Sequence, residues 1–286
     1  MKKKLIALDM DGTLLDSNGK ISAENQAAIK AARDAGHIVM ICSGRHHDSL
    51  SVFLAVEGLA GLPIAANNGA VSLVDEEIID CVQMKQTAVE TLSNWLADHQ
   101  YPFVLYAKQG VYSHVAFLER AEYETKMFDA GVGAGVFAKN PARARVYFKK
   151  LITQEFECLT ELPTDLEFVK LFALTPDPIK KAAFEKFAYS IDGLTVTSSH
   201  TDNVEVSDTR GHKGTGITAV ARSLGIPIED TVAIGDNFND VGMFEIAGMA
   251  IAMGNAEPAI KAMADMVTLS NDEHGVAHAI WEYLLS

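Results

Sequence analysis

An apolar segment near the start of the chain ends abruptly in two carboxylates. Residues 5–8 (Leu-Ile-Ala-Leu) lead directly into Asp9-Met10-Asp11-Gly12-Thr13. A continuous apolar run that stops at a turn signal is typical of a strand buried on both faces, as in a parallel sheet. Ligands of open α/β sheets bind beyond the carboxyl ends of such strands. Two carboxylates this close repel each other unless a cation lies between them or one holds a proton, so this strand end predicts a metal site or an acid–base pair.

Alternating helices and strands predict the same kind of sheet on either side of a central insert. A strand, helix, strand repeat at short spacing is typical of a doubly wound, Rossmann-like parallel sheet, and therefore of the α/β class. In the first part the expected elements are helix 22–35, strand 37–42, a helix ending near 61, strand 63–67 and a hairpin over 71–82. In the last part they are strands 203–206, 231–235 and 249–253 and helices 212–224, 240–247, 258–264 and 272–285.

The middle of the chain follows a different pattern. Strands at 103–106, 111–115, 167–174 and 194–199 are mixed with helices at 86–99, 119–128 and 178–190, and a glycine-rich stretch at 131–135 is expected to be a flexible loop. Hairpins and helices in this mixture predict an inserted α+β domain. We therefore expect core residues 1–82, an insert over 83–200, and core residues 201–286.

Charge and cysteine content restrict the class of partner and the compartment. The chain has 24 Lys and Arg against 38 Asp and Glu, a net charge of −14, which disfavours binding to nucleic acid or to an anionic membrane. No apolar stretch approaches the roughly 18 residues of a membrane span, and the four apolar residues after the basic start are too few for a signal core. The three cysteines are odd in number and widely spaced, with no C-x-x-C pair, which suggests reduced thiols and a cytoplasmic protein. The oligomeric state cannot be read from these features.

Polar residues follow several predicted strands or begin a predicted helix, and a parallel sheet would bring them to one edge. They are Asp9, Asp11, Ser43, Gly44, Lys213 and the segment 236–240 (Asp-Asn-Phe-Asn-Asp). Carboxylates beside a small hydroxyl suit Mg²⁺, which prefers oxygen ligands. A lysine at a helix start adds positive charge to a terminus already suited to phosphate. A metal, a lysine and a second carboxylate together predict phosphoryl transfer.

Taken in order, these motifs resemble those of haloacid dehalogenase superfamily phosphatases, specifically the Cof-like group with a type II cap. Residues 9–15 (DMDGTLL) resemble the first motif, Ser43-Gly44-Arg45 the second, Lys213-Gly214 the third and residues 235–240 (GDNFND) the fourth. Residues 67–70 (NNGA) resemble the group's Asn-Gly-Ala step. Cys42-Ser43 replaces the common Ala-Thr and His212 replaces a common Ser, but the hydroxyl of the second motif is retained.

The resemblance implies a Mg²⁺-dependent phosphatase acting on a small phosphorylated metabolite, with sugar phosphates as the leading class. Asp9 would be the nucleophile that forms an aspartyl-phosphate, and Asp11 the general acid and base. The Asp9 and Asp236 carboxylates and the Asp11 carbonyl would hold the metal. The phosphoryl group would be bound by the Met10 and Gly44 amides, Ser43, Lys213 and Asn239. Asn237 and Asp240 would orient Lys213 or metal-bound water, and Arg45 and Asn68 are candidates for substrate contact.

Two other functions remain open. A phosphomutase would share the aspartyl-phosphate step but pass the phosphoryl group to a different acceptor. A non-catalytic protein that binds a phosphometabolite would have no physical need for Asp9, Asp11, Lys213 and Asp236 together. Gly214-x-Gly216 fits a loose dinucleotide fingerprint, but it falls inside a predicted helix and is interpreted as chance. His46 and His47 are interpreted as surface or structural histidines.

Overall fold

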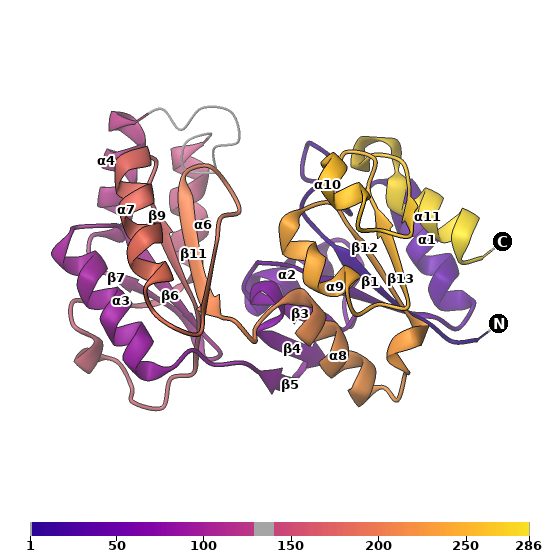
Figure 1. Cartoon of the computed structure of the whole chain (residues 1–286), viewed down its shortest axis with the longest axis horizontal. Coiled ribbons are helices and arrows are strands. Elements are labelled where there is room, and N and C mark those ends of the chain that lie inside the picture. The colour runs from indigo at the N-terminus through magenta and orange to yellow at the C-terminus, as the bar shows by residue number, and fades with distance from the viewer. Residues whose placement is uncertain (1, 129–139, 286) are drawn as a thin grey trace. The chain divides into compact units, whose positions relative to one another are not determined.

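The chain forms two compact units in the computed structural model, which describes residues 2–128 and 140–285 (Figure 1). One unit comprises Met1–Cys81 and Arg210–Ser286, and the other comprises Val82–Thr209. The glycine-rich stretch at 131–135, expected to be a flexible loop, lies outside the described residues.

The first unit is built on an eight-stranded sheet with the order β14-β13-β12-β1-β2-β3-β4-β5. The six strands from β14 to β3 are parallel, whereas β4 and β5 form an antiparallel hairpin at one edge. The strands are β1 (Leu5–Asp9), β2 (Ile38–Cys42), β3 (Ile64–Ala66), β4 (Val71–Val74), β5 (Glu77–Cys81), β12 (Thr231–Gly235), β13 (Met249–Ala252) and β14 (Met266–Val267). Every residue of β1 is buried, which confirms the doubly covered strand that its apolar sequence predicts.

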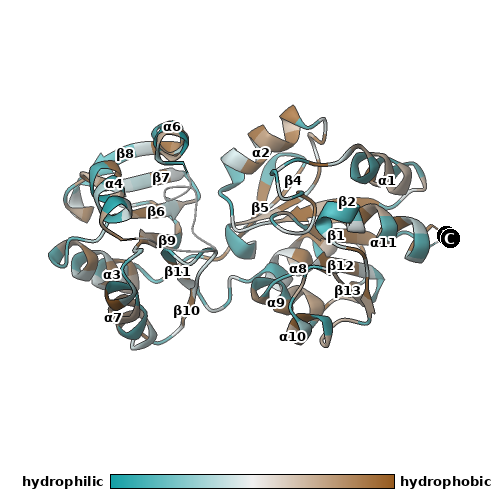
Figure 2. Ribbon diagram, turned by 90° about the horizontal axis from the view of Figure 1, so that it is seen from above, coloured by the Kyte–Doolittle hydropathy of each residue, from teal (hydrophilic) through white to brown (hydrophobic). Residues whose placement is uncertain are grey.

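Helices cover both faces of this sheet, so the doubly wound α/β fold is confirmed (Figure 2). They are α1 (Ala23–Asp34), α2 (His47–Val56), α8 (Lys213–Ser223), α9 (Val241–Phe244), α10 (Pro258–Lys261) and α11 (Gly275–Tyr283). Helix α1 begins where the Ser22 hydroxyl accepts a hydrogen bond from the Asn25 amide at 3.2 Å, and it packs against α11. Helix α8 packs across β3 and β4 and buries Ile217 and Val220 against the sheet. The first turn of α8 is thereby fixed relative to the strands.

The second unit contains a six-stranded sheet with the order β10-β11-β9-β6-β7-β8, antiparallel except for the β7–β8 pair. Its strands are β6 (Phe103–Ala107), β7 (Gly110–His114), β8 (Ile152–Phe156), β9 (Phe168–Leu174), β10 (Leu194–Thr197) and β11 (Asn203–Asp208). Its helices are α3 (Gln86–Asp98), α4 (Phe117–Met127), α6 (Pro141–Leu151) and α7 (Pro178–Tyr189). Leu92 of α3 and Phe184 of α7 pack in one core with Phe103 and Leu171 of the sheet.

The predicted return to the first unit at residue 201 is wrong. Strand β11 pairs antiparallel with both β9 and β10 of the second unit, with Val206 opposite Leu171 and Val196. The second unit therefore extends to Thr209. A short buried strand carries no local signal for which sheet it will join, because its partners lie far away in the sequence. Helix α6 and strand β8 were not predicted either, although Pro141 at the start of α6 is a recognised helix-start signal.

Among the residues that the structure describes, no helix combines the length and the apolar character that crossing a membrane requires.

Candidate active site

Three neighbouring strands end at the same edge of the first sheet and deliver the predicted site residues. Asp9 is the last residue of β1, Ser43 follows β2, and Asp236 follows β12. The sheet order is β12-β1-β2, and Asp9 is the register partner of Cys42. Since parallel strands present their carboxyl ends together, the three side chains start from adjacent positions.

The loop after β1 is fastened to the loop after β12. The Thr13 hydroxyl is fully buried and donates to Asp236 Oδ1 at 2.8 Å. Gly12 has a φ of +94°, and a Cβ at this position would meet the Asp236 carboxylate. The Asn255 side chain donates to the Gly12 carbonyl at 2.9 Å. Thr13 and Asn255 were not singled out from the sequence. Thr13 could have been identified because it belongs to the Asp-Gly-Thr run that follows β1, whereas no local pattern marks Asn255.

A buried lysine joins two of the carboxylates. Lys213, the first residue of α8, donates from Nζ to Asp9 Oδ1 and to Asp240 Oδ1, the latter at 2.5 Å. The side chains of Lys213 and Asp240 are both fully buried. The other Asp240 oxygen accepts the amides of Asp236 at 2.8 Å and Asn237 at 3.0 Å. Both oxygens of Asp240 are therefore engaged, and this carboxylate holds the lysine and the β12 loop in place.

Burial controls the ionisation of this cluster. Burial and the neighbouring Asp240 carboxylate raise the pKa of Asp9 well above its ordinary value, although the Lys213 ammonium opposes the shift. Burial also raises the pKa of Asp236, against the opposing effect of the Thr13 hydroxyl. Burial alone would lower the pKa of Lys213, but the carboxylates of Asp240 and Asp9 outweigh it and raise the pKa. Lys213 therefore stays charged, and its ammonium group stabilises the ionised carboxylates of Asp9 and Asp240.

Asp11 lies outside this buried cluster and pairs with Arg45. Its side chain is 59% exposed, and its two oxygens accept from Arg45 Nη2 at 2.6 Å and Nε at 3.1 Å. The guanidinium also lies 5.5 Å from the centre of the Phe53 ring. A two-point pair of this kind fixes the orientation of the carboxyl group as well as its position. Asp9 and Asp11 are therefore separated in space and in environment, although they are two residues apart.

The other predicted residues border the same loops. Ser43 is buried, and its hydroxyl accepts the Arg45 amide at 3.3 Å. Gly44 lies against Asn68, because a Cβ on Gly44 would be 3.0 Å from Asn68 Oδ1. Asn239 reaches the same Asn68 oxygen at 3.4 Å. The Asn237 side chain accepts a hydrogen bond from the Phe238 amide at 2.7 Å. The Met10 side chain is buried, so only the backbone of Met10 could contact a ligand.

The donor set around Asp9 fits a hard divalent cation. Oxygens of Asp9, Asp236 and Asp240 lie within 4.8 Å of one another, and Asp240 is already committed to Lys213 and two amides. Asp9 and Asp236 remain as carboxylate ligands, and burial raises the pKa of both. The buried carboxylate of Asp9 and the partly buried carboxylate of Asp236 offer only oxygen donors, which matches the preference of Mg²⁺.

A tight turn after β3 positions the start of α8. Gly69 has a φ of +89°, and a Cβ there would collide with the backbone carbonyl of His212, directly before Lys213. We expect Gly69→Ala to lower the free energy of unfolding by about 2–4 kcal/mol, because strain at a positive φ adds to a backbone collision. Gly19→Ala is the matched control, since Gly19 has a φ of +74° but nothing within 4 Å, and should cost only about 1 kcal/mol. Urea unfolding of both variants measures the difference; equal losses would contradict the close approach at Gly69.

Comparison with known proteins gives the family. The sequence pattern of haloacid dehalogenase-like hydrolases matches residues 6–280. The phosphatase YwpJ of Bacillus subtilis is 34% identical over 285 residues, which cover 96% of this chain and 98% of that protein. The 5-amino-6-(5-phospho-D-ribitylamino)uracil phosphatase YwtE of B. subtilis is 32% identical, with 98% of each chain covered. A haloacid dehalogenase-like hydrolase structure from B. subtilis superposes with a TM-score of 0.82 at 30% identity, covering 98% of this chain and 100% of that one. The chain therefore belongs to the haloacid dehalogenase-like hydrolases and is a phosphatase of their Cof-like group.

Proposed function

We propose that this phosphatase hydrolyses a phosphomonoester of a small metabolite by covalent catalysis on Asp9, with Asp11 moving the proton. One observation carries the proposal: two carboxylates of a single loop have opposite surroundings. Asp9 is buried against Lys213, whereas Asp11 is exposed and held by Arg45. Two acids in different environments suit two different chemical tasks.

In the first half-reaction, an Asp9 oxygen attacks phosphorus and the bond to the leaving oxygen breaks. Lys213, which already donates to Asp9, is positioned to donate to the negatively charged phosphoryl oxygens as well. Ser43 and the Gly44 amide border the same sheet edge and supply further donors. Asp11 gives its proton to the leaving oxygen, so the departing alcohol is neutral.

In the second half-reaction, water replaces the alcohol and attacks the aspartyl-phosphate. Asp11, now a carboxylate, takes a proton from that water. The phosphorus–oxygen bond to Asp9 breaks, inorganic phosphate leaves, and the Asp9 carboxylate is restored. The two-point contact with Arg45 holds the Asp11 carboxyl group in one orientation for this proton transfer.

We further propose that Mg²⁺ is held by Asp9, Asp236 and the Asp11 carbonyl, where it would neutralise charge on the phosphoryl oxygens. Asp236→Asn should raise the Mg²⁺ concentration needed for half-maximal activity by at least about tenfold, because an amide is a weaker ligand than a carboxylate. Asp98→Asn, on the exposed end of α3, is the matched control. Phosphate release measured across a Mg²⁺ titration after chelator treatment decides this; an unchanged Mg²⁺ requirement in Asp236→Asn would refute the assignment.

Arg45 is proposed as the residue that positions Asp11. Arg45→Met should lower kcat/KM about 10- to 100-fold for an alkyl phosphate, mostly through kcat, because an alkoxide leaves poorly without a proton. The loss for p-nitrophenyl phosphate should be much smaller, since its leaving group needs no proton. Steady-state kinetics on both substrates give the comparison, with Arg33→Met as control. Equal losses on both substrates would instead assign Arg45 to phosphoryl binding.

The substrate class is proposed as sugar or polyol phosphates, and the compartment as the cytoplasm. One relative is named for a phosphate ester on a ribityl chain, a polyol, and none of the three cysteines of this chain forms a disulfide. The test is a panel of sugar phosphates, polyol phosphates, nucleotides and p-nitrophenyl phosphate with Mg²⁺, read by release of inorganic phosphate. Isomerised sugar phosphate without net release would indicate a mutase, and saturable binding without turnover would contradict catalysis.

A further inference from the structure

The side chain of Asn255 connects the loop after β1 to the last part of the chain. Asn255 lies beyond the carboxyl end of β13, at the same edge of the sheet as Asp9. Its Nδ2 donates to the Gly12 carbonyl at 2.9 Å, and its Oδ1 accepts a hydrogen bond from the Asn271 amide at 3.0 Å. The Asn271 side chain donates to the Leu15 carbonyl at 2.9 Å. A carboxamide carries a donor and an acceptor on separate atoms, and Asn255 uses both.

Gly12 is the residue of this loop whose conformation most needs support. Its φ of +94° lies in the left-handed region, and glycine has more backbone freedom to lose on folding than any other residue. It directly follows Asp11, the proposed general acid and base. The next residue, Thr13, donates to Asp236 and is fixed by this hydrogen bond. A change in the torsion angles of Gly12 would therefore reorient Asp11, and the hydrogen bond from Asn255 restricts these angles.

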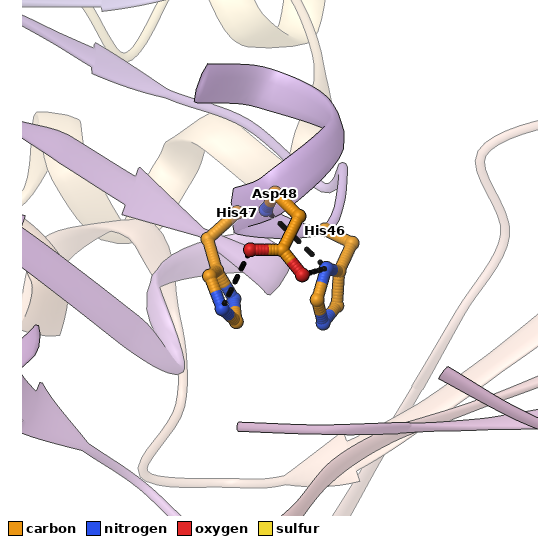
Figure 3. A group of neighbouring side chains, drawn as sticks. All are labelled: His46, His47 and Asp48. Carbon is orange, nitrogen blue, oxygen red and sulfur yellow. Dashed lines mark hydrogen bonds and ion pairs between the residues drawn. The ribbon is translucent and has the colours of Figure 1, made fainter. Parts of the chain in front are cut away.

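The carboxyl group of Asp11 is held separately, by a residue at the start of a helix. Arg45, which contacts both Asp11 oxygens, directly precedes His46, the N-cap residue of α2. The His46 ring accepts a hydrogen bond from the Asp48 amide at 3.4 Å through Nδ1, as an N-cap side chain does in the first turn of a helix (Figure 3). The side chain of Asp11 is therefore held from the start of α2, whereas its backbone depends on the conformation of Gly12.

We propose that Asn255 is a positioning residue for proton transfer by Asp11. This inference rests on the proposed role of Asp11, and it gives a part in the reaction to a residue outside the four sequence motifs. Asn255 acts through the Gly12 carbonyl, and thereby fixes the direction of the Asp11 side chain. A general acid must lie within hydrogen-bond reach of the leaving oxygen, and a displacement of about 1 Å can cost about 100-fold in rate. Loss of Asn255 should therefore slow protonation of the leaving oxygen and not weaken binding of the phosphoryl group.

Asn255→Leu tests the proposal, because leucine has a similar shape but can neither donate nor accept a hydrogen bond. Asn255→Asp is the second variant, since it keeps the acceptor for the Asn271 amide and loses the donor to Gly12. Each should lower kcat/KM, which reports the first half-reaction, about 10- to 100-fold for an alkyl phosphate. The loss for p-nitrophenyl phosphate should stay below about threefold, because its leaving group needs no proton. Asn255 is exposed, so both variants should fold, and circular dichroism checks them.

Asn271→Ala is the matched control. It removes a similar hydrogen bond to the same loop, at Leu15, but keeps the backbone amide that donates to Asn255. Any loss of kcat/KM in this variant should be equal for the two substrates, because Leu15 lies farther from Asp11 along the loop. A loss confined to the alkyl phosphate in Asn271→Ala would overturn the proposal, since the effect would not be specific to Gly12.

Two further outcomes would also overturn the proposed role of Asn255. They are equal losses on both substrates in Asn255→Leu, and wild-type kcat/KM in folded Asn255→Asp. Either result would leave the proposed function intact as long as Asp9→Asn is inactive in the same assay. Phosphate release by Asp9→Asn would instead contradict the proposed function itself.

Discussion

Asp9→Asn should reduce phosphate release by about four orders of magnitude or more, because an amide cannot act as the attacking nucleophile. The substitution is nearly isosteric, and it leaves the ion pair between Lys213 and Asp240 in place. The variant should therefore fold and should still bind substrate. Phosphate release under single-turnover conditions, together with a binding titration, measures both properties.

Asp34→Asn provides the comparison for this substitution. Asp34 ends α1 and pairs with Lys30 on the surface, where both side chains are largely exposed. Its replacement should leave turnover within about twofold of the wild type, since exposed ion pairs contribute little. Activity of Asp9→Asn within an order of magnitude of the wild type would mean that another group attacks phosphorus.

Lys213→Met should abolish turnover and also destabilise the fold. Removing the ammonium leaves the carboxylates of Asp9 and Asp240 buried without their shared partner. Breaking a buried ion pair from one side typically costs about 3–5 kcal/mol. Urea unfolding at pH 7.5 in the presence of a chelator should show a loss of this size. An unfolding free energy within about 1 kcal/mol of the wild type would contradict the buried ion pairs.

The pH dependence of this loss has a defined sign. Burial and Asp240 already raise the pKa of Asp9. Loss of Lys213 removes the positive charge and the hydrogen bond that oppose this rise. A carboxyl group with a higher pKa in the folded state than in the unfolded state stabilises the fold when it is protonated. The deficit of Lys213→Met should therefore shrink as the pH falls from 7.5 toward 5. A deficit that grows as the pH falls would contradict this assignment.

A double variant separates charge from packing. Adding Asp240→Asn to Lys213→Met removes one of the two stranded carboxylates, so part of the stability should return while activity stays absent. If the two losses instead add independently, Lys213 and Asp240 would not be coupled through charge.

The sequence was most informative where an apolar run stops. The ends of β1, β2 and β12 could be predicted because their buried strands finish at Asp9, Cys42 and Gly235. The α/β class followed from the alternation of these runs with amphipathic helices, and the structure confirms it. The local pattern was sufficient because a strand that is covered on both faces is apolar along its whole length and can be recognised from that run alone.

Pairings across long sequence separations could not be predicted in the same way. Lys213 is 204 residues from Asp9, and Arg45 is 34 residues from Asp11, so no spacing rule links either pair. The same limit explains β11, whose residues form a plausible strand but do not specify its partner sheet. Contacts of this kind depend on the tertiary fold rather than on local propensity.

Trapping the covalent intermediate tests the central claim most directly. The enzyme would be quenched in acid during turnover of a substrate with radiolabelled phosphate, and a second sample reduced with borohydride and mapped by peptide mass. The account predicts phosphate bound to the protein, released by hydroxylamine, and a peptide in which Asp9 alone has been reduced to homoserine. Turnover without protein-bound phosphate, or reduction at a residue other than Asp9, would contradict it.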